Sequence, residues 1–277
     1  MGLRVATNIA SLNAQKTMAG SQREVQKSFA QLSSGSRITK AADDAAGLSI
    51  SETLKSTIRG YSQAQRNSND GISMVQVAEG GLGEISNILT RMRELGVQAA
   101  SDTVGADERG FIDKEVQQLK NEVERIAQST RYGSSKLLNG EGENYAFQVD
   151  INNDDFNDRI SFDASAIEAT TTALQIDAFD FSDKESARQA LETLEGSQKL
   201  VNGHRATLGA IQNRLVSTSE NLGVAIQNFS AANSAIRDTD MAESTATLSK
   251  NNILLQASVG VLAQANQQPS MALRLLG

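Results

Sequence analysis

Residues 187–236 read ARQALETLEGSQKLVNGHRATLGAIQNRLVSTSENLGVAIQNFSAANSAI, and the spacing of their apolar residues sets the architecture. Stepping alternately by three and four residues from Ala187 to Ile236 visits fifteen positions, of which twelve are apolar. A seven-residue apolar repeat of this length is typical of a helix that packs lengthwise against other helices. At ~1.5 Å per residue the helix is about 75 Å long, whereas a compact globule of this chain length is only about 50 Å across. The sequence therefore predicts an elongated antiparallel helical bundle.

The first half of the chain carries the same repeat. The stepping recurs over 75–99 and 112–126, so we expect helix in nearly the first hundred residues and in most of 105–130. Pro269 is the single proline in 277 residues, which leaves long helices uninterrupted. Helices from both halves are expected to lie side by side as a rod, so the fold is predicted to be mainly α.

Composition excludes several classes of function. With no Cys and one His, the chain has no disulfide, no thiolate or multi-histidine metal site and no Cys nucleophile. The one histidine, His204, falls on the apolar stripe and is better explained as a seam residue than as a catalytic base. A formal net charge of −7 argues against nucleic acid. No apolar run approaches a membrane span and no secretory leader is visible. We therefore expect no enzymatic activity, no cofactor, no metal and no membrane partner.

Two amphipathic helices are predicted at the chain ends. The first ends at 33–35; the second starts at Asp240, which with Glu243 resembles a capping box, and ends near 266–269. Residues 251–273 carry no charge, so nothing keeps this helix monomeric, and it lacks the Lys and Arg usual on membrane-surface helices. We infer that both ends order when several subunits bring them together. The residues expected to pack there are Met18, Val25, Phe29, Leu32, Leu248, Leu255, Val259 and Leu262.

A small β element is predicted between the helical halves. Residues 145–151 and 160–162 alternate between apolar and polar around the turn 152–155, which is typical of an antiparallel hairpin. Residues 170–176 are a candidate further strand. The turn begins like a calcium-binding EF-hand loop, but Asp155 and Ser161 stand where that loop needs Gly and Glu. A solvated turn is the better interpretation.

Two further motifs are weak. Gly80, Gly81 and Gly83 hint at a phosphate loop, yet they lie inside the apolar stripe with no strand before them, which favours close helix packing. Asp43 and Asp44 could be imagined as an acid–base pair, but neighbouring residues on a helix do not face each other. We interpret them as helix-start or loop acids.

Both ends of the chain resemble those of bacterial flagellins. The segments SSGSRI (33–38) and DDAAGLSI (43–50) resemble the N-terminal signature of that family, and RMRELGVQAA (91–100) resembles its next segment. Near the other end, ILLQA (253–257) and VLAQANQ (261–267) resemble the C-terminal signature, and LRLLG (273–277) ends the chain in the family style. The resemblance covers roughly 1–140 and 185–277.

The resemblance implies a division into three parts. Residues 1–40 with 238–277 would form an inner terminal coiled-coil domain, 41–140 with 178–237 a rod-like helical domain, and 141–177 a small β element, with no large outer domain. Residues 141–195 hold 14 acidic and 3 basic side chains, which suits a surface that faces solvent.

The function that the resemblance implies is structural. Identical subunits of the family polymerise head-to-tail into the extracellular flagellar filament used for swimming, after secretion by flagellar type III export. The implied partners are the chain itself, an export chaperone on the C-terminal helix, a filament cap protein and hook-junction proteins.

A narrower implication concerns immune recognition. In some members a Toll-like receptor reads the positions that match Arg91, Leu95, Gln98 and Glu115 in this sequence. The alternative for Leu95 is packing within the rod. Thr90, Gly96 and Leu119 depart from residues found in other members.

Two other hypotheses keep the helical fold. A helical hairpin from a signalling receptor or adaptor would give stable helices and no filament, and the uncharged C-terminal stripe argues against it. A hook–filament junction protein shares the end motifs and normally forms no long filament. An enzyme would need a convergent site, and none is visible.

Overall fold

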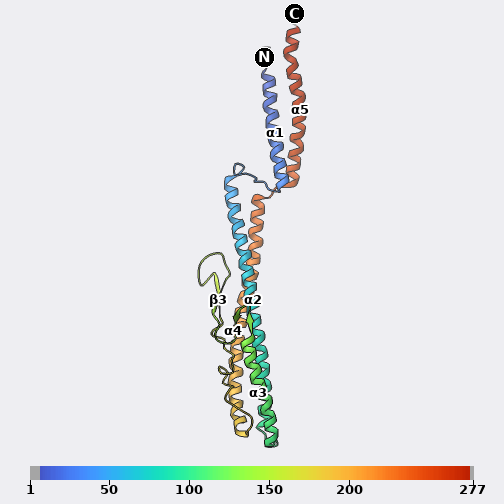
Figure 1. Cartoon of the computed structure of the whole chain (residues 1–277). Coiled ribbons are helices and arrows are strands. Elements are labelled where there is room, and N and C mark those ends of the chain that lie inside the picture. Colours follow the sequence, from blue (N-terminus) through green and yellow to red (C-terminus); the bar gives the residue numbers. More distant parts are fainter. Residues whose placement is uncertain (1–6, 275–277) are drawn as a thin grey trace. The chain divides into compact units, whose positions relative to one another are not determined.

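The structure is a computed structural model that describes residues 7–274, with side chains described as far as residue 267. These residues form, in order, α1 (Ile9–Ser34), α2 (Ala45–Ala99), α3 (Ala106–Ser129), β1 (Arg131–Tyr132), β2 (Ser135–Lys136), β3 (Asn144–Gln148), β4 (Arg159–Asp163), α4 (Lys184–Arg237) and α5 (Met241–Arg274) (Figure 1). The prediction of a mainly α fold with a small β element is confirmed.

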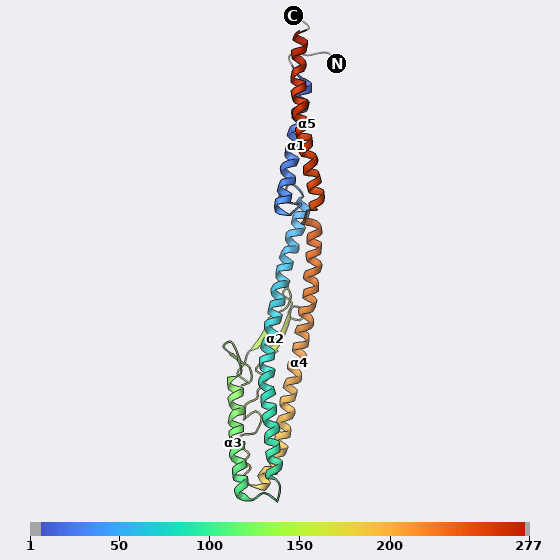
Figure 2. The same cartoon turned by 90° about the vertical axis from the view of Figure 1, so that its right-hand side faces the viewer.

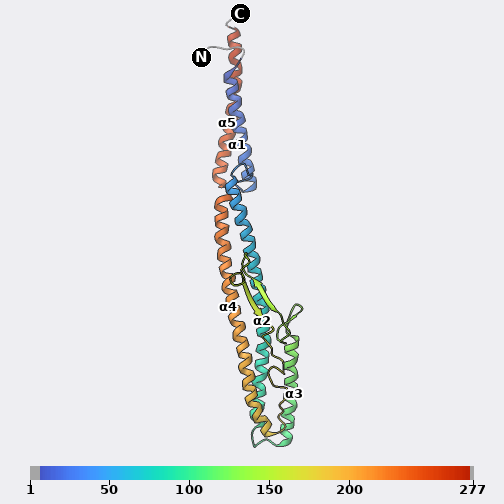
Figure 3. The ribbon, with the colours of Figure 1, turned by 90° about the vertical axis from the view of Figure 1, so that its left-hand side faces the viewer.

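Two compact units divide the described chain. The first combines residues up to 56 with those from 228 onward, and it contains α1 and α5 lying side by side (Figure 2). The second is Thr57–Gln227, in which α3 lies along α2 and the strands lie beside the helices (Figure 3). The first turns of α2 and the last turns of α4 belong to the first unit, and the rest of both helices belongs to the second.

Local hydrogen bonds account for the helix boundaries near the N-terminus. The side-chain oxygen of Asn8 accepts the backbone N–H of Ser11 at 3.1 Å, which caps α1. Gly35 has a φ of 68°, the left-handed conformation that commonly ends a helix, so the predicted end is confirmed. Asp44 starts α2 by accepting the N–H of Gly47 at 2.8 Å. The expectation of a helix-start acid is confirmed.

Asp43 is a loop acid rather than half of a catalytic pair. Its carboxylate accepts hydrogen bonds from the Thr39 hydroxyl at 3.0 Å and from the Lys40 N–H at 3.0 Å. The Thr39 hydroxyl is the main cause that holds the pKa of Asp43 below its usual value. This carboxylate therefore helps to order the loop between α1 and α2.

The start of α5 follows the prediction, but its end does not. Asp240 accepts the N–H groups of Ala242 at 2.8 Å and Glu243 at 3.2 Å, as expected of a helix cap. The helix was expected to end near 266–269, and this is wrong because α5 continues to Arg274. A proline removes one backbone donor from a helix, and the helix can continue where the freed carbonyl finds another donor.

The predicted apolar stripes form the core of the second unit. Burial extends along α2, α3 and α4 with the seven-residue period, which confirms that these helices pack lengthwise. His204 lies half-buried at the edge of this seam, and burial lowers the pKa of its imidazole. The stripe residues with at most 8% exposure include Val75, Ala78, Leu82, Ile85, Leu89, Met92, Ile112, Val116, Val123, Ala187, Ala190, Leu194, Val201, Leu208, Leu215 and Leu222.

The β element contains the predicted hairpin and a second, two-residue pairing. β3 and β4 are antiparallel, with Tyr145 opposite Phe162 and Phe147 opposite Ile160. β1 pairs with β2 antiparallel. Residues 170–176 were expected as a strand, and this is wrong: the segment forms turns, in which the N–H of Ile176 donates to the carbonyl of Thr171. The turns bring apolar side chains of this segment to the core. The alternation of apolar and polar residues predicts a strand for the same purpose.

The glycine cluster lies inside α2, as helix packing requires. A Cβ on Gly81 would lie 2.7 Å from Leu138 Cδ1 and 2.7 Å from Thr130 Oγ1, so this glycine permits the segment after α3 to approach the helix. Gly80 and Gly83 have open space on their Cβ side. The interpretation as close packing is confirmed at Gly81.

Candidate assembly surface

Small side chains line the seam between α1 and α5. Among the side chains that the structure describes, the buried ones of this pair are Ser11, Ala14, Ser21, Ser28, Ser258 and Ala265, each at most 9% exposed. They follow the spacing of three and four residues that faces a partner helix. Small residues at a helix contact reduce the distance between the axes and bury little apolar area. The prediction from large apolar residues does not include them, because Ser and Ala carry little of the apolar signal.

The predicted packing residues divide into two groups. Six of them flank the seam and are half-buried: Met18, Val25, Leu32, Leu248, Leu255 and Leu262. The other two point into solvent, since Phe29 is 67% exposed and Val259 is 55% exposed. The helix pair therefore covers the first group only in part and the second hardly at all.

Large apolar residues are exposed at several positions around the same two helices. Phe29 and Val259 are two of them, and those on α5 could have been found from the lack of charge over residues 251–273. We call this set the outer apolar face; it comprises Ile9, Leu12, Phe29, Ile253, Leu254, Val259 and Val261, all between 42% and 67% exposed. Their spacing places them on several sides of the helix pair, as contacts with more than one neighbouring copy would require.

A groove accompanies the outer apolar face at the C-terminal end of α1. It has a volume of about 690 Å³ and is lined by Val25, Phe29, Ala30, Ser33 and Thr39, among others. Lys40 lies at its edge. An apolar side chain of a partner would find both apolar walls and space here.

A polar clasp joins the two segments that lead into and out of the helix pair. Arg37 donates from its guanidinium to the carbonyl of Ile236 at 2.7 and 3.2 Å, and its backbone N–H donates to the carbonyl of Arg237 at 2.7 Å. The N–H of Thr239 donates to the carbonyl of Gly35 at 3.0 Å. These bonds satisfy carbonyls at the end of α4 and tie the near end of α1 to that of α5.

The positions matched to immune recognition lie in the second unit. Arg91 is exposed and bridges to Glu115 of α3 at 2.9 Å and to Glu94 at 3.1 Å. The bond to Glu115 is the main cause that raises the pKa of Arg91. Gln98 is exposed. Leu95 differs from these residues because it is 2% exposed and belongs to the core, so its side chain serves packing rather than a surface contact.

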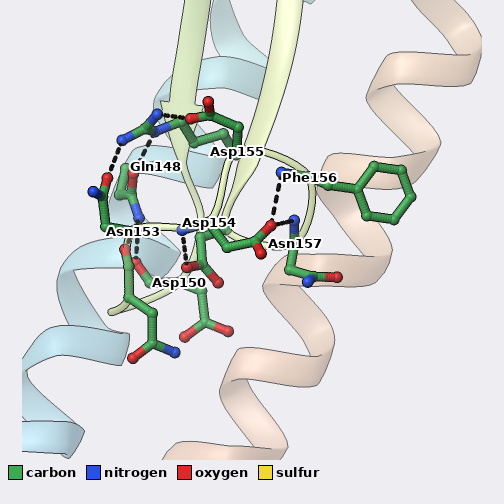
Figure 4. Close-up of polar contacts among 10 residues, drawn as sticks. Gln148, Asp150, Asn153, Asp154, Asp155, Phe156 and Asn157 are labelled. Carbon is green, nitrogen blue, oxygen red and sulfur yellow. Dashed lines mark hydrogen bonds and ion pairs between the residues drawn. The ribbon is translucent and has the colours of Figure 1, made fainter.

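The hairpin turn uses its acidic groups to order its own backbone (Figure 4). Asp154 accepts the N–H groups of Phe156 and Asn157, both at 2.9 Å. Both bonds lower the pKa of the Asp154 carboxyl, and the bond from Asn157 has the larger effect. Arg159 bridges Asp155 to the side chain of Gln148. Phe156 lies 87% exposed at the tip. The arrangement is that of a solvated turn with an aromatic residue displayed on it.

Two kinds of site do not occur in the described part of the chain. Within residues 7–274 no three Asp, Glu, His or Cys side chains are grouped so that they could hold a metal ion. No helix there is both long and apolar enough to cross a bilayer. What the described residues do offer is an uncovered apolar surface on a helix pair.

Comparison with known proteins places this architecture in one family. Residues 5–143 match the family model of the bacterial flagellin N-terminal helical region, and residues 191–276 match that of the C-terminal helical region. The chain is 42% identical to a flagellin of Halalkalibacterium halodurans over 97% of this chain and 98% of that protein. It is 39% identical to a flagellar filament 33 kDa core protein of Treponema phagedenis, with the same coverages.

The solved structures agree with the sequence matches. The crystal structure of Bacillus cereus flagellin superposes with a TM-score of 0.51 at 32% identity, covering 57% of this chain and 88% of that chain.

Proposed function

Because the chain belongs to the bacterial flagellin family and is a structural subunit of the flagellar filament, we propose that its outer apolar face is the surface through which copies assemble. The observation that carries this proposal is the inverted distribution of side chains in the α1–α5 pair. Small residues occupy the seam, while large apolar residues face solvent. A second copy is the occupant because the family builds a polymer of one chain.

Assembly through this face would be coupled to ordering of the helices. Covering an exposed Leu or Ile side chain stabilises by about 1.5–3 kcal/mol when burial is complete. The seam itself buries mainly Ser and Ala, so neighbouring copies supply most of the apolar burial that the pair lacks alone. A head-to-tail contact joins different surfaces of successive copies, and where the rotation between copies does not close into a ring, the assembly grows as a filament.

The domain division of the family applies here as a proposal. Residues 1–40 with 238–277 would form the inner coiled-coil domain, 41–140 with 178–237 the rod-like domain, and 141–177 its β element. The strong hydrogen bonds of the clasp, from Arg37 to Ile236 and from Thr239 to Gly35, lie near the proposed boundary and support it.

Secretion and assembly partners follow from the same membership. We propose that the chain is exported unfolded by the flagellar type III route, and the lack of Cys suits a chain that is threaded without cross-links. A chaperone would cover the uncharged apolar stripe of α5 before export. A cap protein at the filament tip and hook-junction proteins at its base would contact the outer apolar face with helices of their own.

Immune recognition is a finer proposal for the second unit. The exposed bridge of Arg91 and Glu115, with Gln98 nearby on α2, would provide the polar contacts to a Toll-like receptor. Leu95 would act indirectly, because its side chain is buried in the core and packs α2 against its neighbours. Binding of the receptor ectodomain to the Arg91→Ala variant tests this: unchanged affinity would contradict it.

Seeded polymerisation tests the assembly proposal. Concentrated protein is mixed with filament fragments and viewed by negative-stain electron microscopy; long filaments are expected. A chain truncated after residue 250 lacks Ile253, Leu254, Val259 and Val261, and it should remain monomeric while circular dichroism still reports the helix content expected of the remaining helices. Filaments from the truncated chain would show that α5 is not the assembly element.

A further inference from the structure

Asn8 connects the two chain ends with both atoms of its amide. Its side-chain oxygen accepts the Ser11 N–H at 3.1 Å, the helix cap already described. Its side-chain nitrogen donates to the backbone carbonyl of Ala265 at 2.7 Å, although 257 positions separate the two residues. The cap of α1 therefore also contacts a carbonyl in the C-terminal third of α5.

That carbonyl is the one that the single proline leaves without a donor. In an α-helix the N–H of each residue donates to the carbonyl four residues earlier, and position 269 would therefore serve Ala265. Position 269 is Pro, which has no N–H. α5 nevertheless continues through Pro269, and the Asn8 amide supplies the hydrogen bond that the helix itself cannot make.

The seam between the helices does little to define their alignment. Small residues recur in α1 every seven positions, at Ala14, Ser21 and Ser28, and leucines recur in α5 with the same period, at Leu248, Leu255 and Leu262. A shift of the helices by one repeat would therefore bring similar residues together. In coiled coils a single polar contact can specify the register of the helices.

We propose that Asn8 and Pro269 form a register lock that fixes the far end of α1 against α5 in the orientation needed for assembly. The lock rests on the proposed assembly function, since alignment of the helices determines where the outer apolar face presents its residues. The clasp of Arg37 fixes the pair at the C-terminal end of α1, and Asn8 fixes it at the N-terminal end. The 26 residues of α1 lie between these two contacts. Asn8 is a positioning residue that acts through the Ala265 carbonyl.

A double-mutant cycle isolates the lock from the cap. Asn8→Ser keeps a good capping oxygen but removes the amide donor, and Pro269→Ala returns an N–H to the helix. In seeded growth of the full-length chain, Asn8→Ser should raise the critical concentration by roughly three- to tenfold, because the Ala265 carbonyl loses its partner. In the Pro269→Ala background the same change should have an effect of less than about twofold, since the helix then satisfies that carbonyl.

The outcomes separate the lock from the assembly proposal. Amide hydrogen exchange over 255–266 in the same four proteins gives a readout that does not require filaments. Coupled protection in that segment, without growth of any of the four, would leave the lock in place and overturn the assembly proposal. Filament growth with equal effects of Asn8→Ser in both backgrounds, or with none in either, would overturn the lock. Rapid exchange over 255–266 in all four proteins would overturn it as well.

Discussion

Replacing Ile253 by Ser should weaken assembly without weakening the fold of the monomer. Ile253 is 66% exposed, so about two-thirds of its side chain remains to be covered by another copy. Full burial of an Ile side chain is worth about 1.5–3 kcal/mol, and the uncovered share therefore amounts to roughly 1–2 kcal/mol per subunit. Because each 1.4 kcal/mol is a factor of ten, the critical concentration should rise about 5- to 30-fold.

The assay is sedimentation of seeded filaments over a range of protein concentrations. Gln256→Ser is the matched control, because Gln256 is an exposed polar residue one turn away on the same helix. Ile and Ser have similar helix propensities, so loss of helix does not explain a difference between the variants. An unchanged critical concentration for Ile253→Ser, or an equal rise for the control, would refute the assignment of the outer apolar face to subunit contact.

Three further expectations concern the fold of each unit. Gly81→Ala should lower the free energy of unfolding by about 1–3 kcal/mol through overpacking, whereas Gly80→Ala, which meets open space, should raise it by up to about 1 kcal/mol; urea denaturation of both distinguishes them, and equal effects would contradict the packing. Burial lowers the pKa of Lys120 below its ordinary 10.5, so the unfolded chain binds more protons and the free energy of unfolding should rise as pH increases toward 10.5; Lys120→Met should remove this rise, and its persistence would point to another group. Arg37→Ala should increase hydrogen exchange in α1 while the melting of Thr57–Gln227 stays unchanged; a parallel loss in both units would show that Arg37 is no local clasp.

Most of the helical architecture could be predicted because the apolar repeat follows from the need to bury one side of each helix against its neighbours. The stripe from Ala187 to Ile236 lies within α4, and its members Leu194, Leu208 and Leu215 belong to the core of the second unit. The caps at Asp240 and Gly35 were predictable for a similar reason, since capping depends on a few adjacent residues. Capping residues and the apolar repeat are enough to predict a helix where one side of it is buried along its length by another helix.

The signals failed where burial depends on irregular or distant contacts. Leu174 and Ile176 alternate like strand residues, yet both reach the core from a turn, which alternation cannot distinguish. Pro269 normally marks a helix end, but the compensating donor, Asn8, lies at the other end of the chain. No reading of adjacent residues could connect those two positions.

The α1–α5 pair also shows why amphipathic pattern alone could not separate packing within the chain from packing between chains. Val25 and Phe29 are four residues apart and both apolar, yet Val25 flanks the seam and Phe29 points into solvent. The buried residues of α1 in the seam are Ser11, Ala14, Ser21 and Ser28, so small residues and not the largest ones identify the intramolecular face. A helix pair that sets its small residues inward and keeps Phe, Ile and Val outward is stabilised little by its own contacts. Such a pair gains most of its stability only when further copies cover it, which is the property that a polymerising subunit requires.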